Sequence, residues 1–131
     1  MDVKARGDYR FDLDLKKGQY FENALLEMIT TKGDKIEVKA DRMVSMTGNL
    51  AVEFKCRGKL SGISTSESDW YAFVLGGDIY DDEVIILVTT DRLKQIVKKV
   101  YKKNKKVIHG GDGNLSEMIL IQVYDLLRPK K

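Results

Sequence analysis

The chain has few of the residues that build several common kinds of functional site: its 131 residues include one cysteine, one histidine and one proline. The single cysteine, Cys56, excludes an intramolecular disulfide and a cysteine-rich zinc site, which fits a reducing cytoplasm. The single histidine, His109 in a glycine-rich stretch, cannot build a histidine metal site and is poorly placed for Ser-His-Asp or Cys-His catalysis. Catalytic chemistry would therefore depend on carboxylates, lysines and a hard metal ion.

Long hydrophobic runs are also missing. No apolar run approaches the roughly 20 residues that span a bilayer, and the N-terminus is charged from Asp2 onward, unlike a signal peptide. Apolar residues make up 43% of the chain and charged residues 33%, as is normal for a globular protein. We therefore expect a single cytoplasmic domain over residues 1–131, with no membrane contact.

Two short segments alternate apolar and charged side chains, which is the pattern of half-buried strands. They are residues 35–42 and 49–55, and the Gly and Asn of residues 46–49 between them suit a tight turn. The pattern predicts an antiparallel hairpin in which Asp41 lies opposite Glu53 and Lys39 lies opposite Lys55. The four charges would then form one patch, either a site for a divalent cation and a phosphate or an ordinary solvated face with cross-strand ion pairs.

The rest of the chain predicts a mixed sheet with helices on its faces. We expect helices at residues 17–30, 64–75 and 92–103, with residues 1–11 as a loose lead-in. Residues 83–89 form an apolar run typical of a strand covered on both faces, and residues 118–124 are expected to form another strand. One more strand could lie at residues 8–15 or 57–60.

Three sequence features together resemble the PD-(D/E)XK nuclease superfamily. Asp41, Glu53 and Lys55 form the pattern D-x11-E-x-K. Gly18-Gln-Tyr-Phe-Glu22 is similar to the helix start of archaeal-type Holliday junction resolvases. The hairpin residues and the stretch 57–73 resemble segments of small phage nucleases of this superfamily. The resemblance covers about residues 15–90.

The resemblance implies a restriction-endonuclease-like α/β (α+β) fold and a Mg²⁺ or Mn²⁺ ion. It also implies site roles: Asp41 and Glu53 would bind the metal, Lys55 would position or deprotonate water, and Glu22 would be a further ligand. No proline precedes Asp41, so the literal Pro-Asp pair is absent. Glu37-Val-Lys39 is a second E-x-K triplet, so Lys39 could replace Lys55 and Glu37 could replace Asp41.

Positive charge is concentrated between Arg92 and Lys106, where eight residues are lysine or arginine. The apolar residues of this helix would point inward and leave the cations on its outer face. The cations either contact phosphates or form a solvated face stabilised by the helix dipole. The candidate DNA contacts are Lys98, Lys99, Lys102, Lys103, Arg57 and Lys59.

Together with these observations, the resemblance implies a metal-dependent DNA endonuclease that acts on duplex or branched DNA, for example Holliday junctions, in phage or mobile-element DNA processing. Resolving a junction needs two coordinated nicks, so the hypothesis includes a homodimer. The alternatives are a catalytically inactive DNA-binding module of the same fold and a protein-interaction module.

Overall fold

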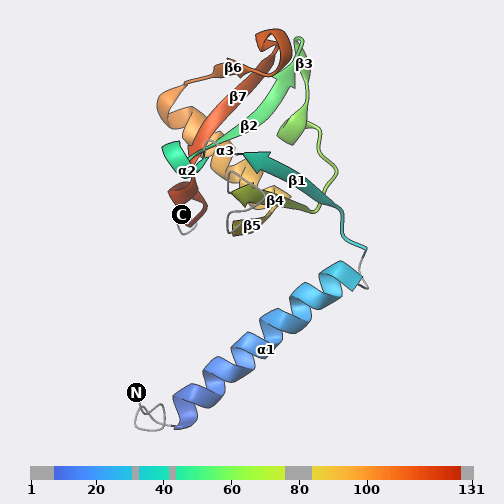
Figure 1. The fold of residues 1–131 in the computed structure, drawn as a ribbon, viewed down its shortest axis with the longest axis vertical. Coiled ribbons are helices and arrows are strands. Elements are labelled where there is room, and N and C mark those ends of the chain that lie inside the picture. Colours follow the sequence, from blue (N-terminus) through green and yellow to red (C-terminus); the bar gives the residue numbers. More distant parts are fainter. Residues whose placement is uncertain (1–7, 31–32, 42–43, 76–83, 128–131) are drawn as a thin grey trace. The chain divides into compact units, whose positions relative to one another are not determined.

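The computed structural model describes residues 8–30, 33–41, 44–75 and 84–127. The chain divides into two compact units, Met1–Asp34 and Lys35–Lys131. Each unit is described by itself, and the second contains both sheets (Figure 1).

The first unit contains helix α1, Asp8–Thr30. The helix is longer at its N-terminal end than predicted, and the possible strand at residues 8–15 is wrong because this stretch is helical. All described side chains of α1, residues 15–27, are exposed, among them the large apolar residues Leu15, Tyr20, Phe21, Leu25 and Leu26. Among the described residues, no helix is both long and apolar enough to cross a membrane.

The second unit contains two sheets, visible in Figure 1. The first is mixed: β4 (Trp70–Leu75) lies between β1 (Ile36–Asp41), which is parallel to it, and β5 (Val84–Thr89), which is antiparallel. The second is antiparallel and has the order β3 (Lys59–Leu60), β2 (Asn49–Cys56), β7 (Ser116–Gln122), β6 (Ile108–Gly110). The predicted α+β class with a mixed sheet is confirmed.

The predicted hairpin is wrong, because β1 and β2 belong to different sheets. A short helix, α2 (Val44–Thr47), follows β1, and the amide of Gly48 donates a hydrogen bond of 2.7 Å to the Val44 carbonyl at its end. The strand partner of Lys39 is Phe73 and that of Glu53 is Met118, so neither cross-strand charge pair of the prediction exists.

The predicted helix at residues 64–75 is also wrong. A 3-10 turn, η2 (Gly62–Ser64), is followed by strand β4. Tyr71 and Phe73 are both buried, and residues two apart in a strand point to the same face. In a helix the same two residues would be separated by about 200° and would point in nearly opposite directions. β4 pairs with a strand on each side and is the central strand of its sheet. Its hydrophobic run is therefore that of a central strand and not that of an amphipathic helix.

Other elements follow the prediction more closely. Helix α3 spans Thr90–Asn104, and the Thr89 side chain caps it by accepting a hydrogen bond from the Arg92 amide. Strands β5 and β7 lie within two residues of their predicted bounds, and β3 supplies the extra strand expected at residues 57–60. Strand β6 was missed, since three residues are too few for a periodic pattern. Two 3-10 turns, Asp112–Asn114 and Val123–Leu127, flank β7.

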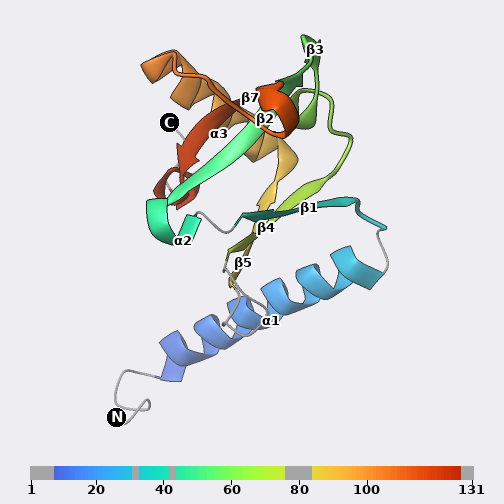
Figure 2. The ribbon, with the colours of Figure 1, turned by 45° about the horizontal axis from the view of Figure 1, so that its top comes forward.

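The core lies between the two sheets and α3 (Figure 2). Its most buried residues are Leu50 of β2, Leu93 of α3 and Ile121 of β7. The other face of the mixed sheet stays exposed within this unit, so the expectation that β5 is covered on both faces is wrong. Exposed apolar side chains on that face are Ile36, Val38, Ile85 and Leu87.

Candidate active site and basic groove

A β-bulge in β2 determines how the Glu53-Phe-Lys55 triplet is displayed. Glu53 pairs with Met118, whereas Lys55 pairs with the adjacent residue Glu117. Adjacent residues of a strand point to opposite faces of a sheet, so the bulge places Glu53 and Lys55 on opposite faces. A regular strand would have put both side chains on one face, which is what the sequence pattern assumes.

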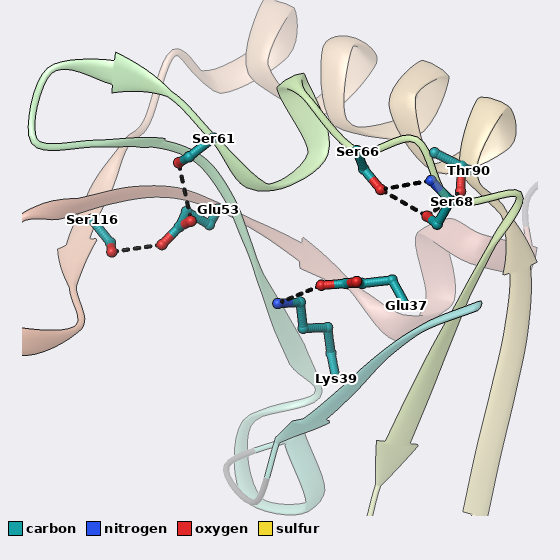
Figure 3. Close-up of polar contacts among 8 residues, drawn as sticks. All are labelled: Glu37, Lys39, Glu53, Ser61, Ser66, Ser68, Thr90 and Ser116. Atoms are coloured by element: carbon teal, nitrogen blue, oxygen red, sulfur yellow. Dashed lines mark hydrogen bonds and ion pairs between the residues drawn. The ribbon is translucent and has the colours of Figure 1, made fainter. Parts of the chain in front are cut away.

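The Glu53 carboxylate is half-buried and held by two hydroxyl groups, as Figure 3 shows. Ser116 Oγ donates to Glu53 Oε1 at 2.6 Å, and Ser61 Oγ donates to Oε2 at 3.0 Å. An ionised carboxylate offers about four lone-pair positions. Two hydroxyl donors therefore leave roughly half of the carboxylate's acceptor positions for another ligand.

Lys39 and Glu37 lie on β1, on the face that pairs with the buried side of β4. Their strand partners are Phe73 and Tyr71, both of which are core residues. Lys39 Nζ lies 3.1 Å from Glu37 Oε1, and about half of each side chain is exposed (Figure 3). An ion pair this exposed contributes little to stability.

A small cavity is lined by residues of both β1 and β2. Lys39 and Glu53 both line it, together with Ala51, Val52, Gly62, Ile63, Tyr71 and Phe73. Its volume of about 20 Å³ is enough for one water molecule. The structure thus brings Lys39 and Glu53 to one cavity, although they come from different sheets.

The oxygen donors here suit magnesium or manganese chemically. Within the part of the chain that the structure describes, no group of three or more His, Cys, Asp or Glu side chains could hold a metal. Asp41 is the last residue of β1, and its side chain is outside the described residues. Magnesium is commonly bound by one or two carboxylates, with water and phosphate as its other ligands, so the Glu53 carboxylate fits its chemistry. Glu37 is paired with Lys39 and is not among the residues that line the cavity.

A second site is an open groove of about 1040 Å³ beside helix α3. Cations on its walls come from α3 and the residues just after it: Arg92, Lys98, Lys99, Lys102, Lys103 and Lys106. The groove is also lined by Asn49 of β2, Ile108 of β6, Leu120 and Gln122 of β7, and one carboxylate residue, Asp125. A concave surface with this many positive charges attracts a polyanion.

The predicted site residues are therefore divided among several places. Lys98, Lys99, Lys102 and Lys103 all line the groove, whereas Arg57 is exposed in the turn between β2 and β3 and Lys59 is exposed at the start of β3. Glu22 is exposed on α1, in the other unit. Lys55 is on the face of β2 opposite Glu53, so of the two lysines only Lys39 shares the cavity with Glu53.

Sequence reasoning missed the residues that hold Glu53. Ser61 follows β3, and Ser116 begins β7, 63 positions after Glu53. Serine is too common for either to stand out, and only the pairing of β2 with β7 brings Ser116 to the carboxylate.

Comparisons with protein-family models, curated proteins and solved structures gave no match to this chain.

Proposed function

We propose that this protein is a metal-dependent DNA endonuclease whose active centre includes Lys39 and Glu53. The observation that carries the proposal is that these two residues line one cavity from strands of different sheets. A lysine and a carboxylate can together position water and offset charge during hydrolysis of a phosphodiester, and the sequence resemblance to the PD-(D/E)XK nucleases implies the same chemistry.

The proposed reaction is attack of a water oxygen on phosphorus. The attacking water gives up a proton to solvent as the bond from phosphorus to the leaving oxygen breaks. The leaving oxygen takes up a proton from solvent, so the products are a phosphate monoester and a free hydroxyl. Glu53, Glu37 and Asp41 are the carboxylates proposed to hold a Mg²⁺ or Mn²⁺ ion. When bound, such an ion supplies an acidified water and neutralises charge on the phosphate oxygens. The Lys39 ammonium donates a hydrogen bond to the attacking water or to a non-bridging phosphate oxygen.

The basic groove supports the DNA part of the proposal. Its six cations are suited to phosphates on a duplex or branched DNA, and contacts of this kind bind without regard to base sequence.

Cleavage of a four-way junction would require two active centres related by a two-fold axis, so a homodimer is part of the proposal. Sedimentation in the presence of junction DNA tests this part.

The groove also favours a second candidate function, a DNA-binding protein without cleavage. The groove would suffice for this function, since phosphate contacts need no catalytic carboxylate.

One experiment separates the two candidates. Purified protein is incubated with supercoiled plasmid and with four-way junctions, in Mg²⁺ or in EDTA. The nuclease produces nicks in Mg²⁺ alone, whereas the binding protein retards the DNA in both buffers and cuts in neither. Absence of both cleavage and retardation rejects both candidates.

A further inference from the structure

Glu53 has more support than a strand residue on a solvated face would need. Its carboxylate accepts hydrogen bonds of 2.6 Å from Ser116 and 3.0 Å from Ser61, one on each oxygen. Ser116 is buried, with 8% of its surface exposed, so its hydroxyl has little access to water. A buried hydroxyl that donates to a carboxylate fixes that carboxylate's orientation.

The loop that carries Ser61 is itself anchored to β2. The Ser61 amide donates to the Phe54 carbonyl at 3.0 Å, and Ser64 Oγ donates to the same carbonyl at 2.9 Å. Gly62 follows with φ of +54°, and a Cβ on Gly62 would collide with the Glu53 carbonyl oxygen. Only glycine allows this close approach, which brings the Ser61 hydroxyl within reach of Glu53.

Both hydroxyls donate, and neither carries a positive charge. A lysine or arginine in their place would neutralise the carboxylate and compete with a cation for it. Two hydroxyl donors instead leave the negative charge in place and leave acceptor positions open on both oxygens. This is how the residues surrounding a metal site commonly hold a carboxylate ligand.

We infer that Ser61 and Ser116 are positioning residues that hold the Glu53 carboxylate for the reaction at the cavity shared with Lys39. The inference rests on the proposed function, since it gives the two serines a role in that same site. Ser116 and Glu53 are far apart in the sequence, and Ser116 reaches Glu53 only because β7 pairs with β2 through the bulge at Glu53.

The test measures the carboxylate directly and then the reaction. Full-length protein carrying ¹³C at the glutamate side-chain carboxyl is compared as wild type, Ser116→Ala and Ser61→Ala, with the Glu53 signal assigned by Glu53→Gln. Ser66→Ala is the matched control, because its hydroxyl hydrogen-bonds to the Ser68 hydroxyl and amide rather than to Glu53. Ser116→Thr keeps the hydroxyl and serves as the rescue variant.

We expect the Glu53 signal to shift in Ser116→Ala and in Ser61→Ala but not in Ser66→Ala. Mn²⁺ affinity measured by calorimetry should fall about 10- to 100-fold in Ser116→Ala, as for other residues that support a metal ligand, and should return in Ser116→Thr. The rate of single-turnover cleavage should follow the same pattern, lower in Ser116→Ala and restored in Ser116→Thr. Circular dichroism confirms that each variant is folded, and Ser61→Ala, at a half-buried position, gives an independent reading if Ser116→Ala fails to fold.

The outcomes separate this inference from the proposed function. An unchanged Glu53 signal in both alanine variants overturns the positioning role, whatever the activity. A shifted signal with unchanged Mn²⁺ affinity and cleavage also overturns it, because the hydroxyls would then hold Glu53 without serving the reaction. If the wild type neither binds Mn²⁺ nor cleaves DNA, the proposed function is wrong, and the catalytic role of the two serines is wrong as well. The Glu53 signal still decides whether the serines hold the carboxylate.

Discussion

Lys39 and Glu53 line the same cavity although Lys39 belongs to the mixed sheet and Glu53 to the antiparallel sheet. β1 orients Lys39 toward the buried side of β4, where its strand partner is Phe73. The bulge in β2 separates Glu53 from Lys55 and turns the two side chains to opposite faces. The pair that shares the cavity is therefore formed by tertiary packing, and not by one E-x-K triplet.

Replacing Glu53 with glutamine should remove metal binding. The substitution keeps the shape of the side chain but removes the charge that would hold a divalent ion. We expect calorimetry to show Mn²⁺ binding in the wild type and none in Glu53→Gln, and cleavage to fall by about two orders of magnitude or more. Glu67→Gln, at an exposed position outside the cavity, is the control and should behave as wild type. Full Mn²⁺ binding by Glu53→Gln would show that the ion is held elsewhere.

Neutralising the groove should weaken DNA binding and leave cleavage intact. Replacing Lys98, Lys99, Lys102 and Lys103 with glutamine removes four of the cations that line it. We expect lower affinity for every DNA sequence, and a slope of log affinity against log salt that flattens by about 0.9 for each duplex phosphate that the variant no longer neutralises. Cleavage at saturating protein should persist, because none of the four lines the cavity of Lys39 and Glu53.

Arg57 and Lys59 provide the comparison for the groove, since they lie outside it, in the turn after β2 and at the start of β3. Replacing both with glutamine should change the salt slope less per charge than the groove substitutions do. A larger effect at the turn would place the DNA path there.

Substituting Gly62 should destabilise the protein more than a left-handed conformation alone explains. Gly62→Ala adds a methyl group that collides with the Glu53 carbonyl oxygen. We expect a decrease of about 2 kcal/mol or more in the free energy of unfolding, measured in urea, from overpacking together with the left-handed backbone. Gly58→Ala is the control: its φ is +79° but its Cβ would meet nothing within 4 Å. Equal decreases in the two variants would mean that the loop can move away from Glu53 at no cost.

Much of the α+β fold could be predicted from local patterns. The cap and the amphipathic pattern of α3 gave its bounds to within two residues, and alternation identified both β1 and β2 as strands. Alternation did not indicate which strands pair. The glycine and asparagine after α2 suggested a hairpin turn, yet Gly48 follows a short helix that carries the chain from one sheet to the other.

The candidate site could be predicted only in part, for the same reason. Glu53, Lys39 and the groove lysines stand out in the sequence by residue type and local spacing, and the structure places them along a cavity and a groove. The bulge that separates Lys55 from Glu53 and the approach of Ser116 depend on the register between β2 and β7. Local periodicity carries no information on that register, so these two features had to come from the structure.

The most direct test of the proposed centre compares Lys39→Ala with Lys55→Ala in single-turnover cleavage of a four-way junction with Mg²⁺. Lys39 lines the cavity with Glu53, whereas Lys55 lies on the opposite face of β2. We predict that Lys39→Ala lowers the cleavage rate by about two orders of magnitude or more, the scale for one positioned group, with DNA affinity nearly unchanged. Lys55→Ala should cleave at close to the wild-type rate. An active Lys39→Ala together with an inactive Lys55→Ala would contradict the account and would make Glu53-Phe-Lys55 the operative triplet.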